Sequence, residues 1–196
     1  MPRPKSYDRD TALRRACEAF WAHGYGALGV RAIEDQTGLN QFAIQIEFGG
    51  KEGLLVEALE FYSDKARQHA LRPMKDGGVA AIAAFFRGLV TDGSPTSSAW
   101  GCLLVNSGVE NAEIRSTRIA AVADAYWRTL RKHFAAALRR SIEDGEIAGH
   151  LDVPDTARAL VSAVIGIHTT NRIAGSNRAG APLVRMIERQ IDGWRI

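Results

Sequence analysis

Apolar residues recur at helical spacing along almost the whole chain, and this periodicity constrains the fold more than any other feature of the sequence. In residues 8–23, Ala16, Cys17 and Phe20 lie three, four and seven positions after Leu13, which places all four on one face of a helix. No stretch alternates apolar and polar residues between turn signals, as a half-buried strand does. The sequence therefore predicts an all-α protein.

The N-terminal part has the outline of a helix-turn-helix unit. After the helix at residues 8–23, the pattern predicts short helices at residues 30–37 and 40–48. Gly38 allows a tight turn between the two short helices, and Asn40 can cap the second one. A longer helix at residues 51–71 should link this unit to the rest of the chain. We therefore expect a three-helix domain in residues 1–52 and a larger helical domain in residues 53–196.

The larger domain should contain several amphipathic helices. Their predicted ranges are residues 79–90, 100–106, 114–143, 155–173 and 183–194, with a polar loop at residues 91–98. The last two helices carry more apolar residues than one subunit core needs, so we expect them to form a homodimer interface. The residues concerned are Leu160, Val161, Val164, Ile167, Leu183, Met186, Ile187, Ile191 and Trp194.

The overall charge says little about nucleic-acid binding. The formal net charge is +3 and the pI is about 9.1, but residues 1–52 contain seven basic and seven acidic residues. The N-terminal domain is therefore neutral. Any affinity for phosphates must come from the local placement of charge, chiefly from Arg3 and Lys5 in the N-terminal arm.

Several other functional classes are disfavoured. The first ten residues have no apolar core, and the longest apolar run, residues 79–86, is too short to cross a membrane. Cys17 and Cys102 are too few for a disulfide scaffold and lack metal-ligand spacing. Neither a phosphate-cradling loop nor a catalytic serine or cysteine pattern is recognisable. We expect a cytoplasmic protein without membrane contact that is not an enzyme and holds neither a metal nor a cofactor.

The segment from Phe20 to Leu55 resembles the N-terminal domain of the TetR family of transcriptional regulators. The matching pieces are FWAHGY, the helix that ends in TGL, and FGGKEGLL, with Phe48, Gly49 and Lys51 at characteristic positions. The resemblance implies a dimeric repressor that binds double-stranded DNA and responds to a small-molecule effector. It implies DNA contacts for residues of the arm, the two short helices and the start of the linking helix: Arg3, Lys5, Arg31, Asn40, Gln41, Phe42, Gln45 and Lys51.

The recognition helix departs from the family pattern. Leu28-Gly29 replaces the usual hydroxyl cap before the preceding helix, Gln45 replaces a tyrosine, and Glu47 replaces a histidine. Glutamine can read adenine through two hydrogen bonds, and Phe42 can contact a thymine methyl group. Glu47 should weaken binding because its charge repels phosphates. An alternative interpretation is a ligand-binding or protein-binding module of the same fold whose operator binding is atypical or lost.

The segment WGCLLVNSGVE resembles a stretch near the effector pocket in a subset of these regulators. Together with apolar and polar residues of neighbouring helices, it predicts an apolar ligand pocket with a few polar groups. The candidate wall residues are Phe85, Phe86, Trp100, Cys102, Asn106, Tyr126, Trp127, His168 and Arg172. Two alternatives stay open: Cys102 is a redox or electrophile sensor if its pKa is lowered, and His168 is a core histidine with its hydrogen bonds satisfied.

Overall fold

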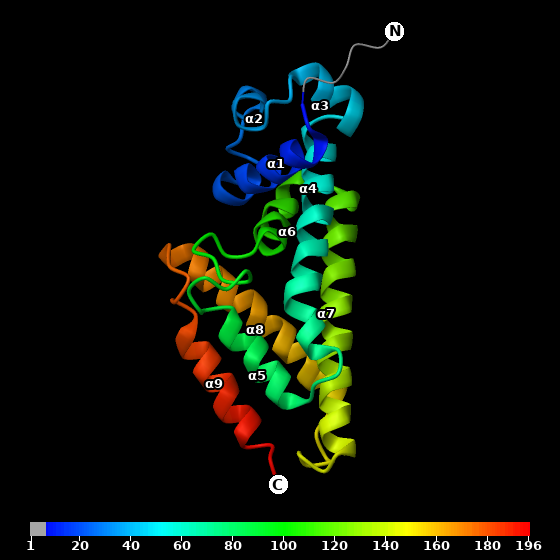
Figure 1. Cartoon of the computed structure of the whole chain (residues 1–196), viewed down its shortest axis with the longest axis vertical. Helices are drawn as coiled ribbons and strands as arrows, with labels where there is room; N and C mark the ends of the chain where they lie inside the picture. The colour runs from blue at the N-terminus through cyan, green and yellow to red at the C-terminus, as the bar shows by residue number, and fades with distance from the viewer. Residues whose placement is uncertain (1–6) are drawn as a thin grey trace.

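The computed structural model describes residues 7–196, without the side chains of residues 70 and 73. Within this part the chain is helical, and its β-structure is limited to an isolated bridge between Ile147 and Arg195. The N-terminal helices are α1 (Arg9–His23), α2 (Val30–Thr37) and α3 (Gln41–Phe48), which lie together at one end of the molecule (Figure 1). The predicted all-α class and the three-helix N-terminal unit are confirmed.

Caps and glycines set the bounds of these three helices. The Asp8 carboxylate accepts a hydrogen bond from the Thr11 amide at 2.8 Å and starts α1. Gly38 takes the left-handed conformation, with φ at 75°, between α2 and α3. Asn40 then caps α3 by accepting from the Ala43 amide at 2.8 Å. The predicted turn and cap are both confirmed.

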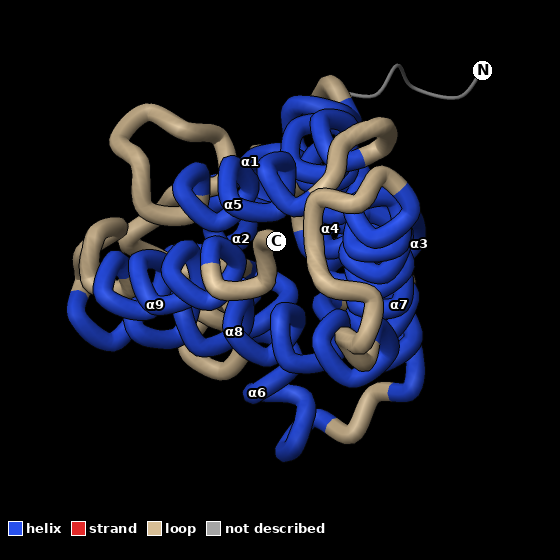
Figure 2. The backbone as a smooth tube through the Cα atoms, turned by 90° about the horizontal axis from the view of Figure 1, so that it is seen from below, coloured by secondary structure: helices blue, strands red, loops and turns tan. Residues whose placement is uncertain are grey.

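The helix α4 (Lys51–Ala66) runs from the N-terminal unit into the larger domain. It continues as a short π-helical segment, Arg67–Leu71, and a 3-10 turn, Arg72–Met74. Beyond them lie α5 (Val79–Gly88), α6 (Leu103–Ile114), α7 (Thr117–Glu143), α8 (Val153–Ala174) and α9 (Ala181–Asp192). Seen from the opposite end, α4 and α7 lie side by side on one flank, and α8 and α9 on the other (Figure 2).

Aromatic rings fill the centre of the larger domain. The rings of Phe86 and Phe134 stack with centroids 5.8 Å apart, and the ring of Phe85 meets both edge-on. Phe86 and Phe134 are fully buried, as are Ile82 and Leu138 beside them. Close packing of this kind ties α5 and α7 into one core.

The sixth helix begins later than the sequence predicts. The expected start at Trp100 is wrong, because α6 begins at Leu103. Gly101 has a φ of 72°, which a helix does not accommodate, and a Cβ there would lie 2.6 Å from the His168 carbonyl oxygen. The long helix predicted at residues 114–143 is interrupted at its start, where Arg115 is left-handed and Ser116 caps α7.

Most of the apolar residues proposed for a dimer interface pack within the subunit, and Val161, Leu183 and Trp194 are half-buried against its core. Leu160, Val164, Ile167, Ile187 and Ile191 are buried within the subunit, so the expectation that they face a second subunit is wrong. Amphipathic helices that pack against their own core bury such stripes without any partner. On the outer side of α9, Met186 is 52% exposed, and on α8 the side chains of Ile165 and Ile173 are also exposed.

No helix in residues 7–196 is both long and apolar enough to span a membrane. The same residues contain no group of three or more histidine, cysteine or acidic side chains arranged to hold a metal ion.

Candidate functional site

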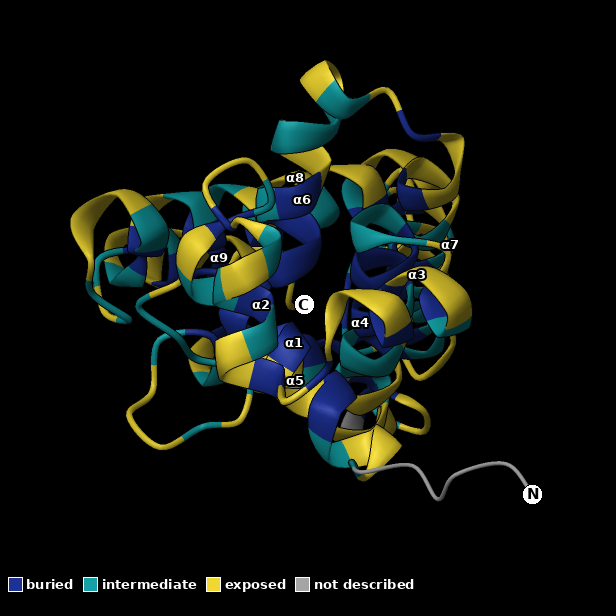
Figure 3. Cartoon of the chain, turned by 90° about the horizontal axis from the view of Figure 1, so that it is seen from above, coloured by how far each residue is buried: buried dark blue, intermediate teal, exposed yellow. Residues whose placement is uncertain are grey.

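The outward face of α3 is polar at two positions and apolar at two others. Ala43, Ile44 and Phe48 are buried against the other helices. Four other side chains are exposed. Gln41 and Gln45 lie one helical turn apart, and so do Phe42 and Ile46. Phe42 is 74% exposed and Ile46 is 67% exposed, so neither packs against its own domain. The exposed side of α3 lies at the end of the molecule, seen from above in Figure 3.

A short hydrogen-bond chain fixes the angle between α2 and α3. The Thr37 hydroxyl donates to the Ile33 carbonyl at 2.6 Å and accepts from the Leu39 amide at 3.1 Å. Ile33 and Leu39 are themselves buried. The turn therefore holds α3 rigidly with respect to α2, as a helix that enters a groove of DNA requires.

The predicted phosphate-contacting residues differ in how far they are exposed to solvent. Arg31 is exposed on α2. The Lys51 ammonium lies 4.2 Å from the centre of the Tyr25 ring, and burial lowers its pKa. Gly29 starts α2 without a side-chain cap, as its residue type predicts. Arg3 and Lys5 lie outside the described residues.

Glu47 is less free to repel DNA than the sequence indicates. It hydrogen-bonds to Tyr7, and burial together with this bond raises the pKa of Tyr7 to about 12. The carboxylate thus has a partner in the segment that leads into α1. Removing its charge would also remove this contact between α3 and the N-terminal segment.

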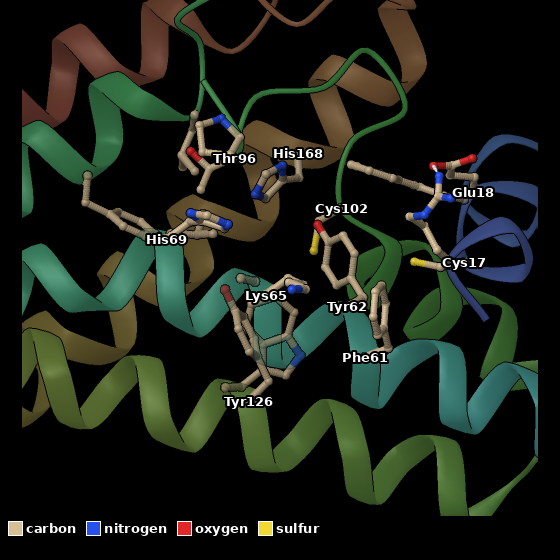
Figure 4. A pocket seen from close by; sticks show the side chains of 18 residues that line it. Cys17, Glu18, Phe61, Tyr62, Lys65, His69, Thr96, Cys102, Tyr126 and His168 are labelled. Carbon is tan, nitrogen blue, oxygen red and sulfur yellow. Dashed lines mark ion pairs between the residues drawn. The ribbon is translucent and has the colours of Figure 1, made fainter. Parts of the chain in front are cut away.

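A cavity of about 330 Å³ lies between the N-terminal unit and the larger domain (Figure 4). Its wall is formed by α1, α4 and its π-helical end, α5, α7 and α8, together with the loop before α6. The lining residues are Arg14, Cys17, Glu18, Trp21, Phe61, Tyr62, Lys65, Ala66, His69, Phe85, Leu89, Pro95, Thr96, Cys102, Tyr126, Trp127, Val164 and His168. Most of this surface is apolar, as is usual for small-molecule sites.

His168 is a deeply buried polar side chain in this wall. The side chain is 5% exposed, and its Nδ1 has no hydrogen-bond partner among the described residues. Burial lowers the pKa of His168 to about 4, so the ring is neutral at pH 7. Figure 4 shows the ring directed into the cavity, with Cys102 and Tyr62 next to it. His168 is thus buried as a core histidine would be, while no group among the described residues bonds to its Nδ1.

Both cysteines border the cavity as protonated thiols. Cys17, on the apolar face of α1, is buried and also reaches the cavity. Burial raises the pKa of Cys17 to about 12 and raises the pKa of Cys102 as well. Tyr62 hydrogen-bonds to Cys102. A thiol with a raised pKa is a poor nucleophile, so nothing in this geometry favours a reactive Cys102.

Charged groups stand at the rim of the cavity. Arg14 and Glu18 pair on α1 with 3.8 Å between their nearest charged atoms, and both side chains are more than half exposed. Lys65 and His69 are exposed on the α4 side of the same rim. Charge is therefore found where water reaches it, and the inner wall is neutral.

The structure brings five of the nine predicted wall residues to the cavity and leaves four outside it. Phe85, Cys102, Tyr126, Trp127 and His168 line it. The other four, which the sequence also assigned to the wall, are Phe86, Trp100, Asn106 and Arg172. Phe86 is stacked on Phe134 in the core, Trp100 packs edge-on against Trp21, and the Asn106 amide donates to the Trp100 carbonyl at 2.9 Å.

Arg172 joins the larger domain to the end of α1. Its guanidinium donates to the carbonyl oxygens of Trp21 at 2.8 Å and Ala22 at 3.1 Å. The Glu110 carboxylate accepts from the amides of Tyr25 at 3.0 Å and Gly26 at 3.1 Å, directly after the same helix. Charges on α8 and α6 thus hold the C-terminal end of α1 from both sides.

The wall residues on α1 and α4 were missed by sequence reasoning. Their helical stripes predict burial, but a sequence does not tell which part of a buried stripe borders empty space. Trp21 carried a usable signal, because its indole needs a hydrogen-bond acceptor when buried. In the structure it donates to the Gly101 carbonyl at 3.2 Å, in the loop that precedes α6.

Comparison with known families gives two matches that together span most of the chain. Residues 78–187 match the family described as "Tetracyclin repressor-like, C-terminal domain". Residues 12–58 match "Bacterial regulatory proteins, tetR family". A curated relative, the HTH-type transcriptional repressor ComR of Escherichia coli (strain K12), is 29% identical over 193 residues, which is 95% of this chain and 87% of ComR.

Solved structures show the same fold. A cysteine mutant of the TetR family transcriptional regulator CifR, complexed with 26bp double-strand operator DNA, superposes with a TM-score of 0.77 at 24% identity, covering 98% of this chain and 99% of that one. A TetR family regulator from Cytophaga hutchinsonii gives a TM-score of 0.83 at 15% identity, covering 96% and 94%. Both relatives pair an N-terminal helical unit with a larger helical domain over nearly their whole length.

Proposed function

Since the chain belongs to the TetR family of bacterial regulatory proteins, we propose that it is a ligand-responsive transcriptional repressor that binds operator DNA as a homodimer. Residues 1–52 form the DNA-binding unit, and residues 53–196 form the ligand-binding and dimerisation domain. The chain acts by binding rather than by catalysis, and it does so in the cytoplasm, where bacterial DNA lies. ComR, a repressor by name, and CifR, solved on operator DNA, support this proposal.

One observation carries the ligand-responsive part: α1 belongs to the DNA-binding unit and also forms one wall of the cavity. Cys17 and Trp21 line the cavity from one side of α1, while Ala16 and Phe20 on the same helix are buried in the hydrophobic core of the protein. A ligand that fills the cavity therefore touches the DNA-binding unit directly. If its contacts differ between two positions of α1, binding shifts the equilibrium between those positions.

The contacts at the end of α1 give this shift a route to α3. Arg172 and Glu110 hold the C-terminal end of α1, so a ligand that tilts α1 does so around this anchored end. The helices α2 and α3 pack on α1 and α4, so a tilt of α1 should carry them with it. In a dimer, a tilt of each N-terminal unit changes the spacing of the two recognition helices and hence the fit to successive major grooves.

DNA reading is assigned to the outward face of α3. Gln41 and Gln45 are exposed one turn apart, in the place where glutamine amides can meet adenine edges. Arg31 and Lys51, together with Arg3 and Lys5 of the arm, contribute phosphate contacts. Exposed Phe42 and Ile46 fit thymine methyl groups, and they also support the alternative of a protein partner at this face.

The test is selection of genomic DNA fragments by the purified full-length protein, followed by affinity measurements on any enriched site. Replacing Gln41 and Gln45 by alanine should relax discrimination at one or two base pairs and cost about 1–3 kcal/mol per bidentate contact. The matched control is Gln190→Ala, an equally exposed glutamine on α9. Absence of any enriched site from a dimeric protein would favour the partner-binding alternative.

A further inference from the structure

The chemistry of the cavity wall restricts what the effector can be. The inner wall holds side chains that are uncharged at pH 7, and burial moves the pKa of Tyr62, Tyr126, Cys17 and Cys102 further above that pH. Burial has the opposite effect on His168 and keeps its ring neutral too. A charged ligand group at this depth would lose its hydration without gaining a counter-charge.

His168 supplies an unused hydrogen-bonding position at this depth. Its Nδ1 is buried without a partner among the described residues, and the ring points into the cavity. Buried polar atoms in native proteins nearly always have partners, and an orphaned one calls for a ligand or a water molecule. The Tyr62 hydroxyl, which belongs to the same wall, is already hydrogen-bonded to Cys102.

The rest of the wall is aromatic. Trp21, Phe61, Phe85 and Trp127 reach the cavity from four different helices, α1, α4, α5 and α7. Flat rings pack favourably against such a wall, edge-on or offset. The volume of about 330 Å³ is at the lower end of the range for small-molecule sites, which suits one or two fused rings.

We infer that the effector is an uncharged aromatic alcohol of phenol type, whose ring lies among the aromatic side chains and whose hydroxyl hydrogen-bonds to His168. A hydroxyl both donates and accepts, so it pairs with either nitrogen of a neutral imidazole. This inference rests on the proposed function, because it takes the cavity to be the effector site.

The test compares three probes substituted at the same ring position: naphthol, methylnaphthalene and naphthoate. Their binding to the full-length protein is measured by calorimetry and by quenching of the tryptophans in the wall. We expect naphthol to bind at least about fivefold tighter than methylnaphthalene, which is what one net hydrogen bond contributes. Naphthoate should bind more weakly than naphthol. Equal affinities for naphthol and methylnaphthalene, tighter binding of naphthoate, or no binding of naphthol would overturn the inference.

Substitutions of His168 and of a control histidine test whether the hydroxyl of bound naphthol pairs with His168. His168→Leu should bring the naphthol-to-methylnaphthalene ratio to about one, and His168→Gln, which keeps a hydrogen-bonding group, should retain part of the preference. His133→Leu is the matched control, since His133 is a half-buried histidine of α7 that does not line the cavity. A preference that survives His168→Leu in a folded protein contradicts the inference. If that variant does not fold, the ranking of the three probes by the unmodified protein decides.

Measuring the DNA affinity with and without naphthol distinguishes a failure of this inference from a failure of the proposed function. If the probes rank as expected but naphthol leaves DNA affinity unchanged, the ligand class stands and the regulatory coupling fails. If DNA binding responds to a charged or acyclic effector while naphthol is ignored, the regulator stands and the ligand class fails.

Discussion

Acidification should destabilise the protein through His168 by an amount that can be worked out. Burial holds the pKa of His168 at about 4 in the folded protein, whereas an unfolded histidine has a pKa of about 6.5. Between these values the unfolded chain binds a proton that the folded chain does not, so stability falls as the pH falls. From about pH 7.5 to about pH 4.5 the loss amounts to about 2.5 kcal/mol in the free energy of unfolding.

Urea unfolding followed by circular dichroism, at a series of pH values, measures this loss. The reference is His168→Gln, which has no titrating group at this position but shares every other carboxylate and histidine with the unmodified protein. The difference between the two pH dependences should equal the calculated loss and should develop between about pH 6.5 and about pH 4. Parallel pH dependences would show that His168 is solvated or paired in the folded protein, and the reasoning about the cavity would fail with it.

Three further predictions concern the contacts between domains and subunits. Arg172→Met removes two charge-assisted hydrogen bonds to the end of α1, so we expect unfolding in urea to become easier by about 2 kcal/mol and the effect of effector on DNA affinity to weaken. Gly101→Ala forces a Cβ to within 2.6 Å of a backbone oxygen at a positive φ and should lower the melting temperature, whereas Gly108→Ala, in open space on α6, should not. Met186→Glu should leave the subunit folded, because Met186 is 52% exposed, and should give a monomer by light scattering. Ile187→Glu should instead unfold the subunit, because Ile187 is 5% exposed. A dimer of unchanged mass for the Met186 variant would place the dimer interface on another surface.

The sequence predicts the N-terminal unit closely, since its bounds depend on local chemistry. Gly38 and Asn40 act within a few residues of their own position, so the turn and the cap could be read directly. The start of α6 could not be predicted in this way. Gly101 lies against the backbone of α8, a helix that is distant in the sequence, and this contact keeps it out of α6. Local propensity contains no information about such a contact.

The cavity was predictable only in part, for a similar reason. Phe85 and Phe86 are neighbours with the same chemistry, yet one faces the cavity and the other is stacked on Phe134. Which of two adjacent aromatic rings borders empty space depends on the rotation of α5 against α7. Cys17 and Trp21 were missed because their helix was assigned to the DNA-binding unit alone.

Because α1 belongs to the N-terminal unit and also lines the cavity, the structure limits how regulators with this architecture can change during evolution. Exchange of N-terminal units between relatives would ordinarily alter the operator and leave the effector unchanged. Under the proposed function, the donor's α1 would bring its own residues at the positions of Cys17 and Trp21 into the cavity that takes the effector. A chimera with a new N-terminal unit would therefore acquire a new operator and a new effector preference together, and sensing and DNA recognition could not be inherited as separate modules.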